Sequence, residues 1–500
     1  MMRIRLLTLL LFAVPCFAAD VSGNWAVRDP LRDGTERTTY LNLKQEGSRI
    51  TGTIRATQFF YKIVDSSGGP ESFTLIASMM DGHTERRVTY EIKLTGDDLH
   101  VTTHRRQDNQ LVEMVARRAP ASEGAYPARI EPPPLHRVPD NGLAKTPPMG
   151  WNSWNKFAGR VDDASVRGMA DAMASNGMKD AGYIYINIDD TWEAGRDANG
   201  NITTNKKFPD MKGLADYVHS KGLKIGIYSS PGPNTCAGYE GSFGHEDQDA
   251  RTYAAWGIDY LKYDWCGARN LYTDEEMQAV YQKMGDALLK SGRLILYSLC
   301  QYGRADVWKW APEVGGNAWR TTGDIRDTWD SMTTIGFAQD PLAPFAKPGH
   351  WNDPDMLEVG NGGMTDDEYR THMSLWSILA APLLAGNDLR SMSPTIHDIL
   401  TNREVIAVNQ DEEGQQGRRV SKSGDQEIWS RPLTAGVQAV GLFNRAPTAT
   451  KITIRWVDLG LTSTPAHVRD LWSHTDLTPL QAGFSTTVAP HGVVLLRVAP

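Results

Sequence analysis

Short apolar segments alternate with amphipathic ones between about residues 147 and 410, and no other feature restricts the fold of the chain as strongly. Eight strand–helix units in about 270 residues is the usual size of a (β/α)8 barrel. An open doubly wound sheet is the alternative, but no glycine-rich phosphate loop follows the first strand. We therefore expect a TIM barrel over residues 141–412. Its candidate strands are 149–152, 183–188, 224–228, 260–263, 294–299, 317–320, 349–352 and 382–386.

All-β regions are predicted on both sides of this barrel. Residues 20–120 contain alternating apolar and polar runs, such as 49–55, separated by turns that contain Gly, which predicts an antiparallel barrel or sandwich. The helical pattern stops near residue 412, and residues 413–500 are predicted to form a C-terminal antiparallel β-sandwich. Residues 121–140 are rich in Pro, Ala and Ser, a composition typical of a linker. For residues 20–120 we favour structural support over carbohydrate or surface binding, because no motif in them indicates a ligand.

The first residues are typical of a secretory signal. Arg3 and Arg5 precede the apolar run 6–14, and the small residues Ala18 and Ala19 follow. We expect residues 1–19 to be removed and the protein to be exported to the periplasm or the extracellular space. No apolar run is long enough to span a membrane. The net charge of -8, without a run of Lys and Arg, disfavours a nucleic-acid partner, and the oligomeric state stays open.

Removal of the signal leaves three cysteines, Cys236, Cys266 and Cys300. Cys236 and Cys266 follow consecutive candidate strands, which lie side by side in a parallel sheet. This arrangement favours a Cys236–Cys266 disulfide with Cys300 free, and Cys266–Cys300 is the alternative. No Cys and His spacing matches a metal-ligand set, so we expect neither a metal nor another cofactor.

Acidic and aromatic side chains follow four of the candidate strands. Barrel enzymes place their catalytic groups at the carboxyl ends of the strands. One such cluster alone is equally well explained by a helix cap, or by a structural ion pair such as Lys262 with Asp264. Four strand ends with the same character favour one shared site. The clusters are Asp189, Asp190 and Trp192; Lys262 and Asp264; Arg320 and Asp324; and Asp353, Asp355 and Met356.

This combination of acids and aromatics favours a carbohydrate substrate. Glycoside hydrolysis needs one carboxyl that stays ionised and another that donates a proton. The ammonium of Lys262 is expected to favour the ionised form of Asp264, as a nucleophile requires. Asp324 lies in a segment that contains Gly323, so it can reach a leaving-group oxygen.

Five ordered motifs resemble glycoside hydrolase family 27, the α-galactosidase or melibiase family. They read PPMGWNSWN from Pro147, INIDDTW from Ile186, YLKYDWC from Tyr260, WRTTGDI from Trp319 and WNDPDML from Trp351. The resemblance covers about residues 140–500 and does not include residues 20–135. It implies a retaining enzyme that hydrolyses terminal α-D-galactosyl residues through a covalent glycosyl-enzyme intermediate.

The resemblance also implies a role for each matching residue. Asp264 would be the nucleophile and Asp324 the general acid/base. The resemblance also supports the Cys236–Cys266 disulfide. The implied substrate-binding residues are Trp154, Asp189, Asp190, Trp192, Lys262, Cys300, Tyr302, Arg320, Asp355 and Met356.

The chain departs from its relatives at two places. Thr191 stands where many relatives carry Cys, so one family disulfide is absent. Gln301 and Tyr302 stand where relatives often carry Glu and Trp, in a loop near the 2-substituent of the sugar. Relatives that prefer N-acetylgalactosamine have Ser and Ala in this loop, so the larger Gln301 and Arg304 argue for a free 2-hydroxyl.

Two alternatives to an α-galactosidase remain. One has the same mechanism with another sugar, as in an α-N-acetylgalactosaminidase or a β-L-arabinopyranosidase. The other is a catalytically silent sugar-binding protein, which the presence of both Asp264 and Asp324 disfavours.

Overall fold

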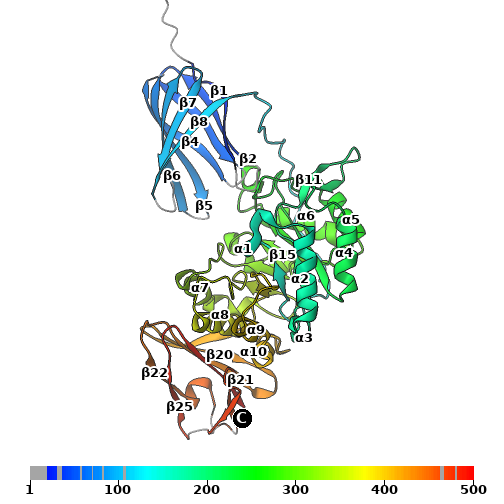
Figure 1. Ribbon diagram of the computed structural model, residues 1–500. Helices are drawn as coiled ribbons and strands as arrows, with labels where there is room; N and C mark the ends of the chain where they lie inside the picture. The colour runs from blue at the N-terminus through cyan, green and yellow to red at the C-terminus, as the bar shows by residue number, and fades with distance from the viewer. Residues whose placement is uncertain are drawn as a thin grey trace, which may run out of the picture. The chain divides into compact units, whose positions relative to one another are not determined.

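The computed structural model describes residues 20–30, 36–56, 59–69, 71–81, 84–104, 109–461, 465, 467–478 and 481–499. The chain divides into two compact units, Met1–Ala125 and Tyr126–Pro500 (Figure 1). The predicted signal, residues 1–19, lies outside the described residues. Among the described helices, none is long and apolar enough to cross a membrane.

The N-terminal unit is a closed antiparallel barrel whose eight strands follow chain order. The first and last strands pair, with Trp25 opposite Arg118, so this part of the chain forms a barrel rather than a sandwich. Closure gives every strand two neighbours, and the apolar side chains that alternate along the strands fill the interior. The strands are β1 Gly23–Pro30, β2 Glu36–Glu46, β3 Arg49–Ala56, β4 Phe59–Gly69, β5 Ser72–Asp81, β6 Thr84–Thr95, β7 Asp98–His104 and β8 Leu111–Ala119.

The larger unit is built on eight parallel strands in the order β17-β16-β15-β14-β13-β10-β9-β18. The backbone N–H of Leu357 donates to Leu384 O over 2.8 Å, and the N–H of Gly386 donates to Leu357 O over 2.9 Å, so the two ends of the sheet meet. This curled sheet agrees with the expected (β/α)8 barrel rather than with an open doubly wound sheet. The strands are β9 Met149–Asn152, β10 Tyr185–Asn187, β13 Lys224–Ser229, β14 Tyr260–Asp264, β15 Leu296–Cys300, β16 Ala318–Arg320, β17 Trp351–Asp353 and β18 Leu383–Ala385. A separate pair, β11 Glu193–Arg196 and β12 Ile202–Thr204, is antiparallel.

Helices follow the strands, and several of them begin at side-chain caps. Asp162 accepts from the backbone N–H of Ser165 at the start of α2, and Thr365 forms a capping box with Glu368 at the start of α8. The helices are α1 Trp154–Phe157, α2 Asp163–Ser175, α3 Met178–Ala181, α4 Met211–Ser220, α5 Glu246–Trp256, α6 Met277–Lys290, α7 Trp329–Gly336, α8 Asp366–Ile378, α9 Pro394–Thr401 and α10 Arg403–Asn409. Short 3-10 turns are η1 Ala158–Arg160, η2 Ala268–Asn270, η3 Arg304–Lys309, η4 Ala311–Val314, η5 Asp340–Phe345, η6 Thr434–Gly436 and η7 Trp456–Leu459.

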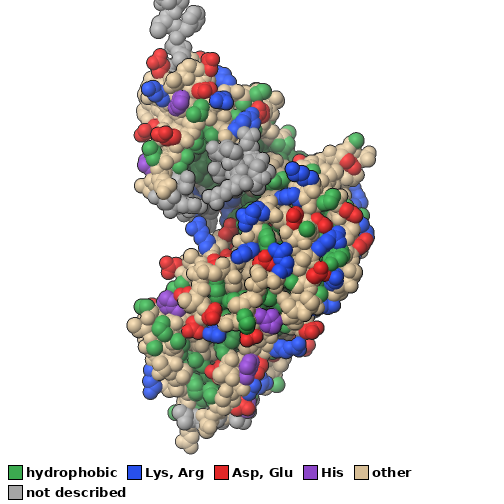
Figure 2. All heavy atoms as spheres, viewed as in Figure 1, with side chains coloured by type: hydrophobic (Ala, Val, Ile, Leu, Met, Phe, Trp, Pro, Cys, Tyr) green, Lys and Arg blue, Asp and Glu red, His purple; other side chains and the backbone are tan. Residues whose placement is uncertain are grey.

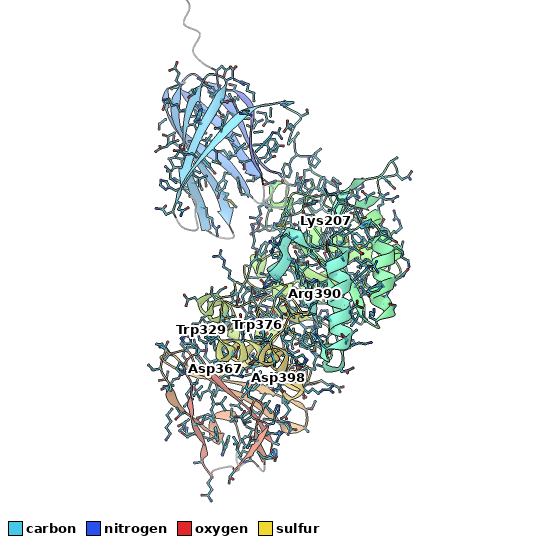
Figure 3. The ribbon with its side chains drawn as sticks, viewed as in Figure 1. Lys207, Trp329, Asp367, Trp376, Arg390 and Asp398 are labelled. Carbon is cyan, nitrogen blue, oxygen red and sulfur yellow. A yellow bond between two sulfur atoms is a disulfide. The ribbon has the colours of Figure 1, made fainter. Side chains whose placement is uncertain are left out.

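The C-terminal strands form two sheets with a shared apolar core, as the sequence predicts for a sandwich. They contact α8, whose Trp376 is labelled in Figure 3. The buried Arg431 connects the two parts, since its Nη1 donates to the carbonyl oxygens of Ser377 and Asn409 over 2.9 and 3.0 Å. The strands are β19 Arg418–Ser423, β20 Gln426–Pro432, β21 Gln438–Asn444, β22 Thr450–Arg455, β23 His467–Asp470, β24 Thr475–Leu477, β25 Gly483–Val488 and β26 Val493–Ala499.

The proline-rich segment is more than a spacer, because its residues 126–140 lie along the larger unit. The buried side chain of Gln282 on α6 accepts from the backbone N–H of His136 and donates to Pro134 O, over 2.8 and 2.9 Å. The N–H of Val138 donates to Glu313 O over 2.8 Å. Composition correctly indicates an extended chain without regular structure, but these contacts come from residues far along the sequence.

Replacing Gln282 with Ala tests this attachment. The change leaves the N–H of His136 and the carbonyl of Pro134 without their partner, so we expect a loss of about 1–3 kcal/mol in the free energy of unfolding. Urea denaturation followed by tryptophan fluorescence measures it. Gln415→Ala is the matched control, because Gln415 is exposed and donates only to Glu413. Equal midpoints for Gln282→Ala and the wild type would show that the segment contributes nothing to stability.

Candidate active site

The carboxyl ends of the parallel strands carry the side chains that the motifs contain. Asp264 is the last residue of β14, and Arg320 is the last residue of β16. Asp189 and Asp190 follow β10, and Asp355 follows β17. All five side chains are buried. Because adjacent parallel strands end at one edge, the fold collects these charges in a single cluster.

Two phenols hold the carboxylate of Asp264. Tyr302 Oη donates to Oδ1 over 2.6 Å, and Tyr228 Oη donates to Oδ2 over 3.2 Å. Burial raises the pKa of Asp264, while the Lys262 ammonium and the Tyr302 hydrogen bond oppose this rise. The carboxylate is therefore fixed in orientation and kept out of water, a state that suits attack on an electrophilic carbon.

The half-buried Lys262 forms an ion pair with the buried Asp189 in the same cluster. Its Nζ lies 2.8 Å from Asp189 Oδ2, and Asn152 Nδ2 donates to the same oxygen over 2.8 Å. Burial disfavours the charged lysine, but Asp189, Cys300 and Asp264 together outweigh this cost and hold the pKa of Lys262 well above its usual value. Lys262 therefore faces Asp264 as a permanent cation.

Asp190 keeps one carboxylate oxygen free. Its Oδ2 accepts from the backbone N–H of Ala237 over 2.8 Å, whereas Oδ1 is buried and has no hydrogen-bond partner among the described residues. Burial raises the pKa of Asp190 to about 7, and the hydrogen bonds from Thr235 and Ala237 only partly offset it. A buried acceptor without a partner is costly, so this oxygen is available to a hydroxyl group of a ligand.

Arg320 connects two carboxyls of different character. Its Nη2 lies 3.0 Å from Asp355 Oδ2 and 3.1 Å from Asp324 Oδ1. The side chain of Asp324 is 67% exposed, whereas that of Arg320 is 3% exposed. Burial of its surroundings would raise the pKa of Asp324, but the charges of Arg320 and Lys262 prevail and lower it. Burial raises the pKa of Asp355 despite Arg320. Asp324 is exposed and can exchange a proton with water, whereas Asp355 is buried.

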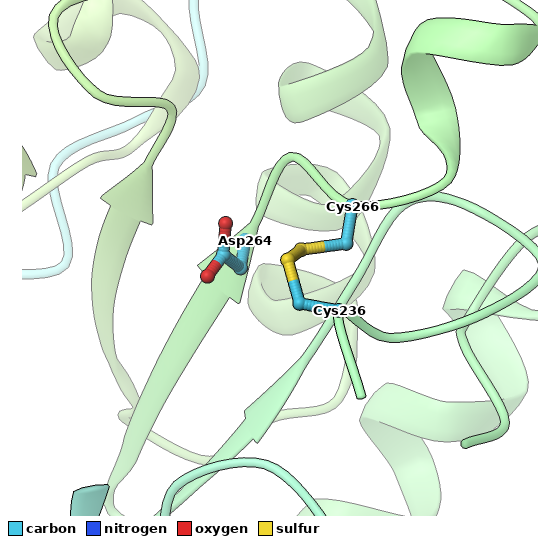
Figure 4. A group of neighbouring side chains, drawn as sticks. All are labelled: Cys236, Asp264 and Cys266. Carbon is cyan, nitrogen blue, oxygen red and sulfur yellow. A yellow bond between two sulfur atoms is a disulfide. The ribbon is translucent and has the colours of Figure 1, made fainter. Parts of the chain in front are cut away.

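A disulfide joins Cys236 to Cys266 beside Asp264 (Figure 4), with the Cα atoms 5.0 Å apart. The pairing favoured from the sequence is confirmed, and Cys300 is free and buried. Among the described residues, Cys236, Asp264 and Cys266 are the one group of three or more His, Cys, Asp and Glu side chains near enough to share a metal ion. The disulfide removes the thiolates that such a site would use.

Three other predicted residues, Cys300, Met356 and Trp154, lie at or shortly after the ends of strands of this sheet. Cys300 Sγ accepts from Arg320 Nη1 over 3.7 Å. Met356 is buried next to Asp355, and Trp154 is half-buried at the start of α1. The position of Tyr302 is given by its hydrogen bond to Asp264.

The side chain of Trp192, a predicted substrate-binding residue, lies in the apolar core. Its side chain is fully buried, and its indole N–H donates to Tyr228 O over 2.9 Å. Its ring packs edge-on against Tyr253 and Trp256, with centroids 6.3 and 5.7 Å apart. Trp192 therefore stabilises β13 through this hydrogen bond and through packing in the core.

Sequence reasoning missed two residues that contact the central carboxylates. Tyr228 bonds Asp264, and Asn152 bonds Asp189. Both end a candidate strand, 224–228 and 149–152, so the rule that selected the acids would also have found these polar strand ends. Both side chains are neutral, so charge alone does not single them out.

Comparison with known proteins agrees with this geometry. A family described as "Alpha galactosidase A" matches residues 146–411, and the "Alpha galactosidase C-terminal beta sandwich domain" matches residues 423–498. Alpha-galactosidase 2 of Arabidopsis thaliana is 51% identical over 357 residues, which are 70% of this chain and 89% of that protein.

Two further relatives define the range of similarity. The crystal structure of α-galactosidase I from Mortierella vinacea has a TM-score of 0.68 and 40% identity, and the match covers 72% of this chain and 98% of that one. The α-N-acetylgalactosaminidase of Gallus gallus is 40% identical over 399 residues, which are 72% of this chain and 95% of that protein. With more than half of its length matched by the first family and with the acidic strand ends in place, the chain belongs to glycoside hydrolase family 27, the α-galactosidase or melibiase family.

Proposed function

We propose that this glycoside hydrolase is a retaining α-galactosidase that removes terminal, non-reducing α-D-galactosyl groups. The observation that carries the proposal is the unequal pair of carboxyls, with Asp264 buried between two phenols and Asp324 exposed at the rim beside Arg320. A retaining hydrolase requires one fixed nucleophile and one carboxyl that exchanges protons with the leaving group and with water.

In the first step, Asp264 attacks C1 of the galactosyl group, and the bond from C1 to the leaving oxygen breaks. Asp324 supplies the proton to that oxygen. The lowered pKa of Asp324 in the free site follows from Arg320, so a bound substrate must weaken this contact before Asp324 can carry a proton. Arg320 Nη2 keeps two other partners when this contact weakens, because it also lies 3.1 Å from Thr322 O and 3.0 Å from Asp355 Oδ2.

In the second step, water attacks C1 and gives its proton to Asp324, and the bond between C1 and Asp264 breaks. The ionised form of Asp324 that Arg320 favours suits this base role. Lys262 faces Asp264 and stabilises the carboxylate that is released. Neither step calls for a metal or another cofactor.

The remaining polar groups suit the hydroxyls of one galactosyl unit. Asp190 Oδ1 lacks a partner, and Asp189 with Lys262 forms an adjacent buried pair of acceptor and donor. We assign Asp190 and Asp189 to the 4- and 6-hydroxyls, and Lys262 to the 3- and 4-hydroxyls. Arg320 and Asp355 would hold hydroxyls near C2 and C3, and Trp154 would form a wall. Cys300, Tyr302 and Met356 complete the predicted surroundings.

A second candidate activity changes only the sugar. The relative that acts on N-acetylgalactosamine is 40% identical, against 51% for the Arabidopsis α-galactosidase. Gln301 and Arg304 are also larger than the Ser and Ala that such relatives have in this loop. Both observations favour galactose with a free 2-hydroxyl.

We also propose export after removal of residues 1–19, with catalysis assigned to residues 141–412. On the face seen in Figure 2, acidic and basic side chains are interspersed over the larger unit, as expected for a protein with a neutral substrate. For the N-terminal barrel we propose a supporting role, because apolar side chains fill its interior.

The first test separates the two carboxyls. Asp264→Ala should lower turnover of 4-nitrophenyl α-galactoside at least ten-thousandfold, because it removes the nucleophile. Asp324→Ala should retain a burst with this activated substrate and regain turnover with azide, which attacks the intermediate without a general base. Proton NMR should show α-galactose as the first product of the wild type. Normal turnover by Asp264→Ala, or β-galactose as first product, would contradict the mechanism.

A second test concerns the 2-position. The wild type should hydrolyse 4-nitrophenyl α-galactoside at least a hundredfold faster, in kcat/KM, than the 2-acetamido analogue or 4-nitrophenyl β-L-arabinopyranoside. The physical reason is that bulky side chains in the loop after β15 leave little room for an acetamido group. In addition, Asp189 and Asp190 bind the 4- and 6-hydroxyls of galactose, and arabinose lacks the 6-hydroxyl. A preference for either of the other glycosides would favour the alternative activity.

A third test uses the burial of Asp190. The pKa of Asp190 in the folded protein, about 7, lies above its value in the unfolded chain. The fold therefore favours the protonated carboxyl, and this contribution to stability is present at low pH and is lost as pH rises from about 4 through 7. Asp190→Asn should therefore gain on the order of 2 kcal/mol at pH 8 and nothing at pH 4, while galactose binding is lost. Thermal unfolding at both pH values and calorimetry with galactose measure this. Asp398→Asn is the control, because this side chain is 81% exposed (Figure 3). An equal gain at both pH values would refute the assignment of the raised pKa to Asp190.

A further inference from the structure

Tyr302 makes the shorter of the two hydrogen bonds to Asp264. Its hydroxyl lies 2.6 Å from Oδ1, against 3.2 Å for Tyr228 and Oδ2. Hydrogen bonds to ionised oxygens are short and about twice as strong as neutral ones.

The backbone holds Tyr302 in the required direction. Its φ is +64°, and the next residue, Gly303, has φ +79°, so two successive residues adopt the left-handed conformation. A Cβ atom on Gly303 would lie 2.2 Å from Thr321 O. The N–H of Gly303 donates to Arg320 O over 3.1 Å. The turn is therefore attached to the end of β16, and it directs the phenol back toward β14.

The surroundings of the ring leave Asp264 as the strongest acceptor for the hydroxyl. The guanidinium of Arg320 lies 5.9 Å from the ring centroid, and Cys236 Sγ lies 3.7 Å from Oη. A disulfide sulfur is a weak acceptor, whereas a carboxylate oxygen of Asp264 lies 2.6 Å from the hydroxyl. Tyr302 thus contacts Asp264, Arg320 and Cys236, and its hydroxyl donates a hydrogen bond to Asp264.

We propose that Tyr302 is a positioning residue for the nucleophile, whose hydroxyl fixes Oδ1 of Asp264 and stabilises the charge that returns to it in the second step. This inference rests on the proposed retaining mechanism. In that step the oxygen of water bonds to C1, its proton passes to Asp324, and the electron pair of the bond between C1 and Asp264 returns to the carboxylate. A donor on Oδ1 makes Asp264 a better leaving group and a weaker nucleophile.

Loss of the hydroxyl should therefore affect the two steps unequally. The covalent intermediate should form readily and break down slowly, so it accumulates. The ionised carboxylate also loses a stabilising donor, so the acid limb of kcat/KM should move to higher pH. Other groups facing Asp264 would be unchanged. They are Asp189 after β10, Tyr228 on β13, Lys262 on β14, Arg269 on η2, Tyr281 on α6, Cys300 on β15 and Asp324 after β16.

The experiment compares Tyr302→Phe with the wild-type enzyme on 4-nitrophenyl α-galactoside. We expect kcat to fall about tenfold to a hundredfold, KM to fall with it, and a pre-steady-state burst of nitrophenol to appear. Tyr272→Phe is the matched control, because its hydroxyl donates to Ile130 O. Thermal unfolding of each variant verifies that it is folded.

Tyr302→Trp provides a second variant, since it fills the ring site without a phenol. The inference is overturned if either folded variant keeps the wild-type kcat, KM and acid limb. It is also overturned if kcat falls while KM and the acid limb stay unchanged, as a general loss of packing would produce. Failure of the proposed function is distinguishable, because the wild-type enzyme itself would then not turn over the galactoside.

Discussion

The site depends on two cations, the half-buried Lys262 and the buried Arg320, which allow several carboxylates to lie close together. An isolated charge in a protein interior is costly, and it is tolerated only with partners. Lys262 pairs with Asp189, and Arg320 pairs with Asp355 and Asp324. Without these two cations, mutual repulsion would hold most of the acids in the protonated form.

The two cations offset only part of the cost of burying these carboxylates, and the pKa values of two other acids show this. Burial raises the pKa of Asp190 to about 7 and that of Asp353 to about 6. Among the described residues, neither of these acids has an ion pair, whereas Asp189 and Asp324 each have one. Ionisation of these buried acids lowers the stability of the fold at neutral pH. The same burial leaves polar groups without partners that a ligand can use. Among the described residues, the buried Asp190 Oδ1 has no hydrogen-bond partner, so a ligand hydroxyl would satisfy it.

The sequence predicted those parts of the structure that follow from local pattern. Short apolar runs between turns placed all eight strands, and strand ends placed Asp264 and Arg320. Strand adjacency identified the disulfide. Other features depend on long-range contacts. The docking of residues 126–140 requires Gln282 and Glu313, the inward direction of Trp192 depends on Tyr228, and the contact of Tyr302 requires a left-handed turn packed on β16. Periodicity and spacing contain no information about these directions.

The absent family disulfide shows how such contacts can replace a covalent bond. Thr191, where many relatives carry Cys, has φ +87°, a conformation that a β-branched residue rarely adopts. Lys207 Nζ donates to Thr191 Oγ1 over 2.8 Å and to Gly159 O over 2.9 Å, which connects the loops after β9 and β10 (Figure 3). The N–H of Thr191 also donates to the buried Glu193 over 3.1 Å. A disulfide acts mainly by restricting the unfolded chain, whereas these hydrogen bonds act on the folded loop itself. The turn that carries Asp189 and Asp190 is therefore held by local polar contacts, and its geometry depends on the charge of Lys207 rather than on a covalent link.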